Sequence, residues 1–154
     1  MRRRILLAAM PSIVAGRASA QGRSEVAAEQ AWSRPALARI GTAVVYLNLR
    51  NVGSRPVRLV DGSTPVAEAV EIHESIVEDG LARMRPRSDG VAVPQGGTVR
   101  FEPSGLHLML MRPHDDLKVG QGFILTLRFD DGTSLEVPVQ VTMRQPTASH
   151  SGAH

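Results

Sequence analysis

The chain has 154 residues, with 18 Lys and Arg against 15 Asp and Glu, a formal net charge of +3, and no cysteine. The absence of thiols excludes thiolate catalysis, iron–sulfur clusters, cysteine-based zinc sites and blue-copper electron transfer, which needs a cysteine ligand. A single domain with one hydrophobic core suits this length.

The N-terminus has the pattern of a signal peptide. Three arginines follow Met1, a mostly apolar run extends from Ile5 to Gly16, and small residues at 18–20 precede Gln21. These features are the charged region, the apolar region and the A-x-A cleavage pattern of an exported protein. An apolar run of about twelve residues is too short to anchor the chain across a bilayer. We therefore predict a signal peptide at residues 1–20, of Sec or twin-arginine type, and a periplasmic location.

Removal of this segment changes the charge balance. It takes away four arginines, which leaves 14 basic residues against 15 acidic ones and a net charge of about −1. A nucleic-acid partner then loses its electrostatic support. No later stretch is long and apolar enough to cross a bilayer, so we predict no membrane span in the mature chain.

The remaining chain is predicted to form short strands separated by turn residues. Residues 21–28 are polar and small and predict a loose leader. Strands are predicted at residues 42–50, 57–60, 66–77, 81–84, 98–101, 105–113, 123–129 and 135–143. Asp79-Gly80 and residues 130–132 are hairpin turns. Because no apolar repeat has helical spacing, we predict an all-β, antiparallel β-sandwich or barrel at residues 21–143 and a disordered tail at 144–154.

One predicted strand carries an unusual face. Between residues 106 and 111, leucines alternate with His107, Met109 and Met111. The leucines account for the buried face of a sandwich, and the other three side chains point to the opposite side. His73 and Met84 lie on the two arms of the hairpin that turns at residues 79–80, so a single long-range contact would bring all of these side chains together.

Imidazole and thioether groups together indicate a soft metal. Without carboxylate or thiolate ligands they prefer Cu(I), and the lack of a thiolate suits a site that hands its metal on. A redox or hydrolytic catalyst would need an open site with a base nearby, and no such signal is evident, so we do not expect an enzyme. A lone methionine on a strand is more often core, and a lone histidine is more often a surface or hydrogen-bonded residue. The residues alone leave both interpretations open.

The spacing His73-x10-Met84-x22-His107-x-Met109 resembles the copper-binding motif of the periplasmic copper chaperone A family, also called PCuAC or DUF461. Further blocks resemble conserved parts of that family: Ala31–Pro35, Val45–Asn51, Val70–His73, Met84–Pro86, Val93–Gly97 and Leu106–Met111. The resemblance implies a cupredoxin-like β-sandwich and a Cu(I) site made by the four motif residues. It also implies copper supply to the CuA centre of cytochrome c oxidase, either to the subunit that carries this centre or through a Sco-type copper/thiol protein.

The chain departs from the family pattern at two points. Many members have a methionine directly after the first histidine, where this chain has Glu74, so an accessory thioether is missing. The gap between Met84 and His107 is 22 residues, one more than the commonest pattern, and loop closure depends only weakly on such a difference.

Three further expectations concern the surroundings of this site. Met111 shares the face of His107 and Met109 but lies outside the motif, so we expect it beside the metal rather than bound to it. His150 and His154 in the tail are candidate ligands for Cu(II), which imidazole suits well. The alternative function is a secreted β-sandwich that binds a protein through its methionine face without any metal.

Overall fold

Ten strands and one short 3-10 helix make up the part of the chain that the computed structural model describes, residues 22–147. The helix, η1, spans Ala38–Ile40. The strands are β1 (Val26–Ser33), β2 (Thr42–Asn51), β3 (Val57–Ser63), β4 (Ala67–Glu78), β5 (Leu81–Pro86), β6 (Val91–Val93), β7 (Thr98–Phe101), β8 (Leu106–Pro113), β9 (Gly122–Phe129) and β10 (Ser134–Val141). The predicted all-β class is confirmed. The predicted signal peptide and both tail histidines lie outside the described residues.

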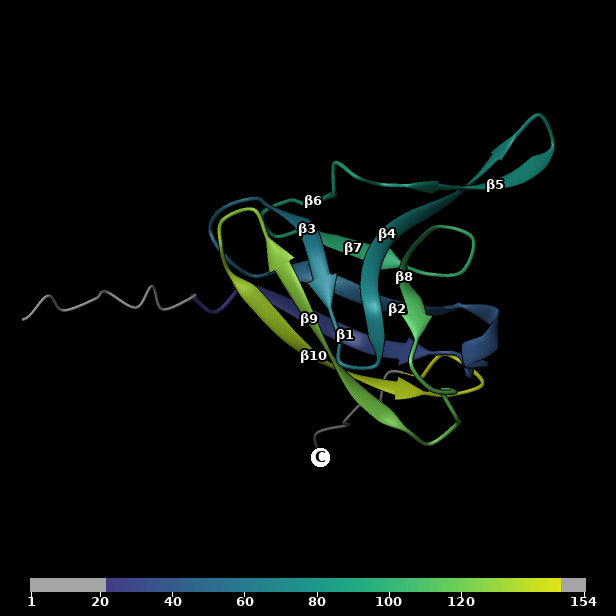
Figure 1. Ribbon diagram of the computed structural model, residues 1–154. Helices are drawn as coiled ribbons and strands as arrows, with labels where there is room; N and C mark the ends of the chain where they lie inside the picture. Colours follow the sequence, from purple (N-terminus) through teal and green to yellow (C-terminus); the bar gives the residue numbers. More distant parts are fainter. Residues whose placement is uncertain (1–21, 148–154) are drawn as a thin grey trace, which may run out of the picture.

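The strands form one sheet that curls back on itself (Figure 1). Their order is β5-β4-β8-β7-β2-β1-β10-β9-β3-β6, and β3 also pairs with β4, which brings the two ends of the order together. Gly62 makes this closing contact with Val70, where an added Cβ would lie 3.1 Å from a valine methyl group. Two short pairings, β1 with β10 and β7 with β8, are parallel, and the other strand pairings are antiparallel as predicted.

The leucine face of β8 belongs to the core. Leu108 and Leu110 are almost completely buried and lie in one cluster with Val45 of β2 and Ile72 of β4. In register, Leu108 is opposite both Ile72 and Val45, so these side chains share the inner face of the sheet. The strand face that carries the histidine and the methionines is therefore the outer face.

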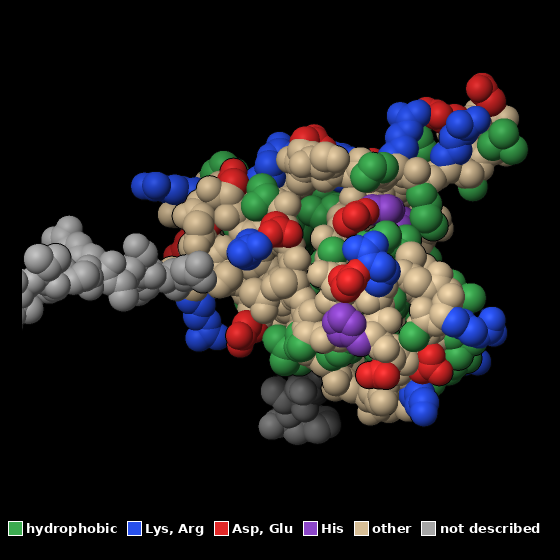
Figure 2. All heavy atoms as spheres, viewed as in Figure 1, with side chains coloured by type: hydrophobic (Ala, Val, Ile, Leu, Met, Phe, Trp, Pro, Cys, Tyr) green, Lys and Arg blue, Asp and Glu red, His purple; other side chains and the backbone are tan. Residues whose placement is uncertain are grey.

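The hairpin of β4 and β5 extends beyond the body of the molecule (Figure 1). Its turn residues, Asp79 and Gly80, have positive φ angles of 50° and 74°. This is the backbone that a two-residue hairpin turn requires, and it confirms the prediction from the Asp-Gly pair. Every residue of β5 is exposed, and Figure 2 shows charged side chains of both signs on the projecting arm.

The predicted loose leader is wrong from Val26 onward. Val26 is 3% exposed and begins β1, which pairs with β2 along its length. Alanines occupy three of the six positions from 26 to 31, so the apolar alternation is weak in the sequence, although the small side chains pack against the core. The three-residue strand β6 also escaped prediction because it is too short to show a pattern.

Among the described residues, no helix is long and apolar enough to span a membrane.

Candidate metal centre

His73 and His107 lie directly opposite each other on neighbouring antiparallel strands, β4 and β8. Their side chains therefore point to the same face of the sheet, and their ring centroids are 5.8 Å apart with the planes tilted by 57°. This separation leaves room for one ion bonded to both rings at the about 2 Å typical of metal–imidazole bonds. The predicted long-range contact is thus made by two residues that are directly opposite each other across β4 and β8.

The ring of His107 has one nitrogen hydrogen-bonded to the backbone and one nitrogen without a partner among the described residues. The residue is 3% exposed, and Nδ1 lies 3.1 Å from the carbonyl oxygen of Gly105, to which it donates. Burial lowers the pKa of His107; the hydrogen bond to Gly105 raises it, and the neighbouring charge of His73 lowers it. The remaining nitrogen, Nε2, is buried and has no hydrogen-bond partner among the described residues.

His73 is held in the opposite way. Its Nε2 atom lies 2.8 Å from Oε2 of Glu71, two residues earlier on the same face of β4, and its Nδ1 atom is buried without a partner in the described structure. Buried polar atoms are nearly always hydrogen-bonded, so two orphaned nitrogens on adjacent rings need an explanation. A metal ion that accepts a lone pair from each ring would satisfy both.

The two motif methionines flank this histidine pair on the same face. Met109 of β8 is opposite Glu71, and Met84 of β5 is opposite Ser75, so each lies two residues along from His73, on opposite sides of it. Such diagonal neighbours are about 7–8 Å apart between Cα atoms, within reach of a long side chain. Met109 is 8% exposed, whereas Met84 is 60% exposed. The structure thus brings the four predicted ligands to one patch with a buried side and an open side.

The outer face is more buried around His107 and Met109 than a solvent-facing strand would be. Trp32 and Tyr46 are also buried, with ring centroids 5.0 Å apart, and both lie outside the main core cluster. Val44 of β2 is opposite Met109 and lies on the same strand face as Tyr46, two residues later. Part of the outer face of the sheet is therefore buried as well.

The neighbouring candidate residues take different places. Met111 lies on the same face as Met109, opposite Ala69, and is half-buried. Glu74, which replaces the accessory methionine of many relatives, faces the other side of β4, where it pairs with Arg87 at 2.8 Å. Within residues 22–147, no three His, Cys, Asp or Glu side chains gather as a metal site.

Two groups that position the histidines were missed in the sequence. Glu71 shares a strand face with His73 because the two are separated by one residue, so the period of two could have identified it. Gly105 acts through its backbone carbonyl, which also accepts a hydrogen bond from the Ser75 amide at 3.0 Å. No residue pattern signals a backbone acceptor of this kind.

Similar solved structures define the class of protein. A copper-bound PCuAC domain from PmoF2 superimposes with a TM-score of 0.64 at 21% identity, covering 80% of this chain and 97% of that domain. The Cu(I)-bound solution structure of DR1885 from Deinococcus radiodurans has a TM-score of 0.60 at 28% identity, with 82% and 83% covered. The fold is therefore the cupredoxin-like β-sandwich of PCuAC domains.

Sequence comparison then gives the family. Residues 26–141 match the LpqE-like family model, and the chain belongs to this family, which is the PCuAC (DUF461) family. "Putative lipoprotein Lxx21020" of Leifsonia xyli subsp. xyli is 31% identical over 116 residues, which span 75% of this chain and 69% of that protein. Protein RP573 of Rickettsia prowazekii is 30% identical over 120 residues, or 76% and 66% of the two chains. The predicted family is confirmed.

Proposed function

We propose that this chain is a copper chaperone that binds one Cu(I) ion through His73, Met84, His107 and Met109. The observation that carries this proposal is the pair of buried, partnerless ring nitrogens on adjacent strands, flanked by two thioethers. Imidazole and thioether together suit Cu(I). A solved relative at 28% identity, DR1885, is a Cu(I) complex, which supports the same metal here.

The hydrogen bonds of the two rings support a choice of ligand atoms. Glu71 occupies Nε2 of His73, and the Gly105 carbonyl occupies Nδ1 of His107. Copper would therefore bind Nδ1 of His73 and Nε2 of His107. Partners of this kind fix the ring orientation of a ligating histidine and raise its basicity.

The difference in burial between the two methionines suggests how copper leaves. His107 and Met109 are buried beneath the outer layer, whereas Met84 is 60% exposed on the edge strand β5. A receiving protein would reach the ion from the side of Met84 and could replace this thioether first. The absence of thiolate ligands keeps the hold on copper weak enough for such an exchange.

The cellular setting follows from the family and the predicted leader. We place the signal peptide at residues 1–20, the copper-binding domain at 21–143 and the tail at 144–154, with the mature protein in the periplasm. A lipoprotein name for the Leifsonia relative supports export. The receiving protein would be the cytochrome c oxidase subunit with the CuA centre or a Sco-type copper/thiol protein, or the chain would buffer envelope copper.

A Cu(I) competition titration tests this function. Residues 21–154 should take up one equivalent of Cu(I), and His107→Ala should weaken binding by at least about tenfold, equivalent to 1.4 kcal/mol. His114→Ala, at an exposed position after β8, is the matched control and should bind as the wild type does. The alternative of a metal-free protein-interaction module predicts no stoichiometric uptake by any of the three proteins.

A further inference from the structure

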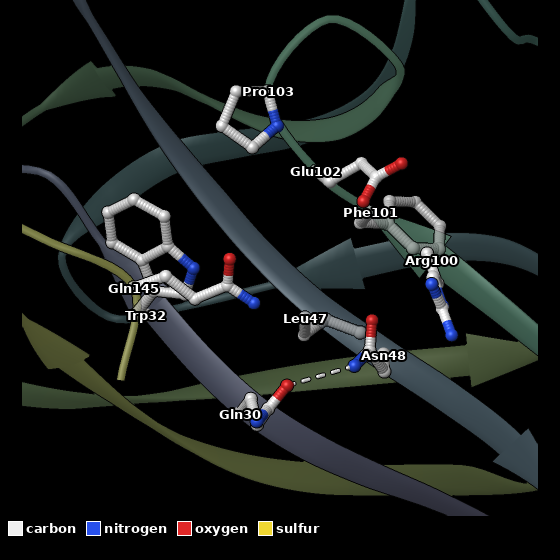
Figure 3. A pocket seen from close by; sticks show the side chains of 9 residues that line it. All are labelled: Gln30, Trp32, Leu47, Asn48, Arg100, Phe101, Glu102, Pro103 and Gln145. Carbon is white, nitrogen blue, oxygen red and sulfur yellow. Dashed lines mark hydrogen bonds between the residues drawn. The ribbon is translucent and has the colours of Figure 1, made fainter. Parts of the chain in front are cut away.

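A hollow lies on the outer face of the sheet, toward β1 from the candidate metal centre (Figure 3). It has a volume of about 230 Å³. Figure 3 shows Trp32 and Gln145 on one side, Arg100 and Glu102 on the other, and the Gln30–Asn48 pair below. Arg100 is opposite Asn48 in register, so strands β1, β2 and β7 all contribute to this polar pocket.

Backbone strain marks the base of the pocket. Gln30 has a φ angle of 54° and lies in a bulge where the register of β1 and β2 shifts between Glu29 and Trp32. Its Oε1 atom accepts a hydrogen bond from Nδ2 of Asn48 at 3.1 Å. A residue other than glycine rarely adopts such a φ angle, and strain of this kind clusters at ligand sites. The bulge places the amide side chain of Gln30 in the pocket, whereas a regular strand would direct this side chain elsewhere.

The groups around the pocket have spare bonding capacity. Within residues 22–147, the guanidinium of Arg100 and the carboxylate of Glu102 form no ion pair, and the indole N–H of Trp32 donates no hydrogen bond. The amide nitrogen of Gln30 and the amide oxygen of Asn48 are also unused by their mutual bond. The pocket therefore offers one positive group, one negative group and several neutral donors and acceptors.

We propose that this pocket binds a small zwitterion of dipeptide length. Arg100 would take the carboxylate, Glu102 the ammonium group, and the Gln30–Asn48 pair the central amide. Arg100 lies in β7 and Glu102 directly follows this strand. Residues two apart in an extended chain are about 7 Å apart, and a ligand of two extended residues spans at most about 7 Å, so the lengths match. The volume lies below the about 300 Å³ at which drug-sized ligand sites begin, which also favours a small ligand.

The pocket is close to the candidate metal centre but chemically separate from it. Glu102 and Pro103 form its wall, and the same turn ends at Gly105, which holds His107. None of the proposed copper ligands lines the pocket. The proposal therefore stands independently of copper binding and is tested in metal-free protein.

The test is a titration of the metal-free chain with L-alanyl-L-alanine. Trp32, the sole tryptophan of the sequence, reports binding through its fluorescence, and the ¹⁵N–¹H signals of its indole and of the Gln30 and Asn48 amides give a second readout. We expect saturable changes in both. Arg100→Gln and Glu102→Gln should each weaken binding by at least about tenfold, as the loss of a charged hydrogen-bond partner does.

The controls separate a specific pocket from general charge effects. Arg55→Gln removes an exposed arginine from the turn after β2 and should leave binding unchanged. Acetate and methylammonium, which supply one charge each, should bind far more weakly than the dipeptide. Absence of a saturable change in either readout at millimolar dipeptide would overturn the proposal. The proposal would also be overturned if the Arg100 and Glu102 variants bound the dipeptide as tightly as the wild type does, or if acetate bound as tightly as the dipeptide.

Discussion

Each of the two facing histidines donates through one ring nitrogen and leaves the other free, but the free nitrogens differ. Nδ1 is free in His73 and Nε2 in His107, because a carboxylate holds one ring and a backbone carbonyl holds the other. Both rings are thus fixed before any metal arrives. A preorganised pair of this kind loses less conformational entropy on binding than two mobile side chains would.

Replacement of Glu71 tests the assignment at His73. Glu71→Gln keeps an oxygen that accepts the Nε2 proton, so Cu(I) affinity should stay near that of the wild type. Glu71→Ala frees Nε2 and should weaken Cu(I) binding by about 10- to 100-fold. Imidazole ¹⁵N shifts should show coordination of the His73 ring through Nδ1 in the wild type and the Gln variant. Coordination through Nε2 in the wild type would show that Glu71 has no such role.

The burial of His107 predicts a pH dependence of stability in the metal-free protein. Burial lowers the pKa of His107 in the folded state, while the unfolded chain takes up its proton near pH 6.5. The unfolded state therefore binds more protons below that pH, and the free energy of unfolding should fall as the pH drops from about 6.5 toward the folded-state pKa. Urea unfolding across this range measures the effect. His107→Gln should show a shallower decline, and an identical decline in that variant would assign the effect to other groups.

At the level of elements, β8 separates two tasks by its alternation. Its leucines lie in or against the core, while His107 and Met109 are buried on the opposite face. Because neighbouring residues on a strand point to opposite faces, a substitution on one face should change stability and on the other should change metal affinity.

A set of three variants on β8 tests this separation. Leu110→Ala should cost about 2–5 kcal/mol of stability, since it leaves a cavity in the core. Met109→Leu keeps volume and apolarity, so it should cost less than about 1.5 kcal/mol while Cu(I) affinity falls sharply. Met111→Leu should cost much less affinity than Met109→Leu. Denaturant unfolding and Cu(I) titration measure the two effects, and equal losses of affinity in both methionine variants would make Met111 a direct ligand.

The tail provides a second prediction at this level. His150 and His154 lie outside the described residues, and their role stays a prediction from imidazole chemistry. Truncation after Met143 should abolish Cu(II) binding and preserve Cu(I) affinity if the tail captures oxidised copper. Titration of both oxidation states measures this. Unchanged Cu(II) binding by the truncated chain would leave the tail histidines without a role in metal capture.

Elements with strong patterns were predictable from the sequence, and those with weak patterns were not. The Asp79-Gly80 turn and the alternation of β8 have unambiguous local chemistry, so the hairpin and both strand faces were predicted correctly. β1 was missed because its alanines make the alternation of apolar and polar residues weak, and because its packing depends on β2. The pairing of His73 with His107 could be anticipated only as a long-range contact, because register across β4 and β8 is set by the whole sheet.

For the whole molecule, the sheet brings residues from the β4–β5 hairpin and from β8, which is distant in sequence, to one patch. Strands β5, β4 and β8 are neighbours in the sheet, although β6 and β7 lie between β5 and β8 in the chain. The inner core stabilises this arrangement independently of the metal, since the leucine and valine cluster contains none of the four proposed ligands. The metal-free protein should therefore be folded and ready to bind.

X-ray absorption at the copper edge of the Cu(I)-loaded full-length mature chain tests the proposed site most directly. We expect a copper shell with nitrogen from His73 and His107 and sulfur from Met84 and Met109, with the sulfur contribution reduced in Met109→Leu. The sequence contains no cysteine, so any sulfur scatterer must be a methionine. A shell of nitrogen and oxygen alone would contradict the site.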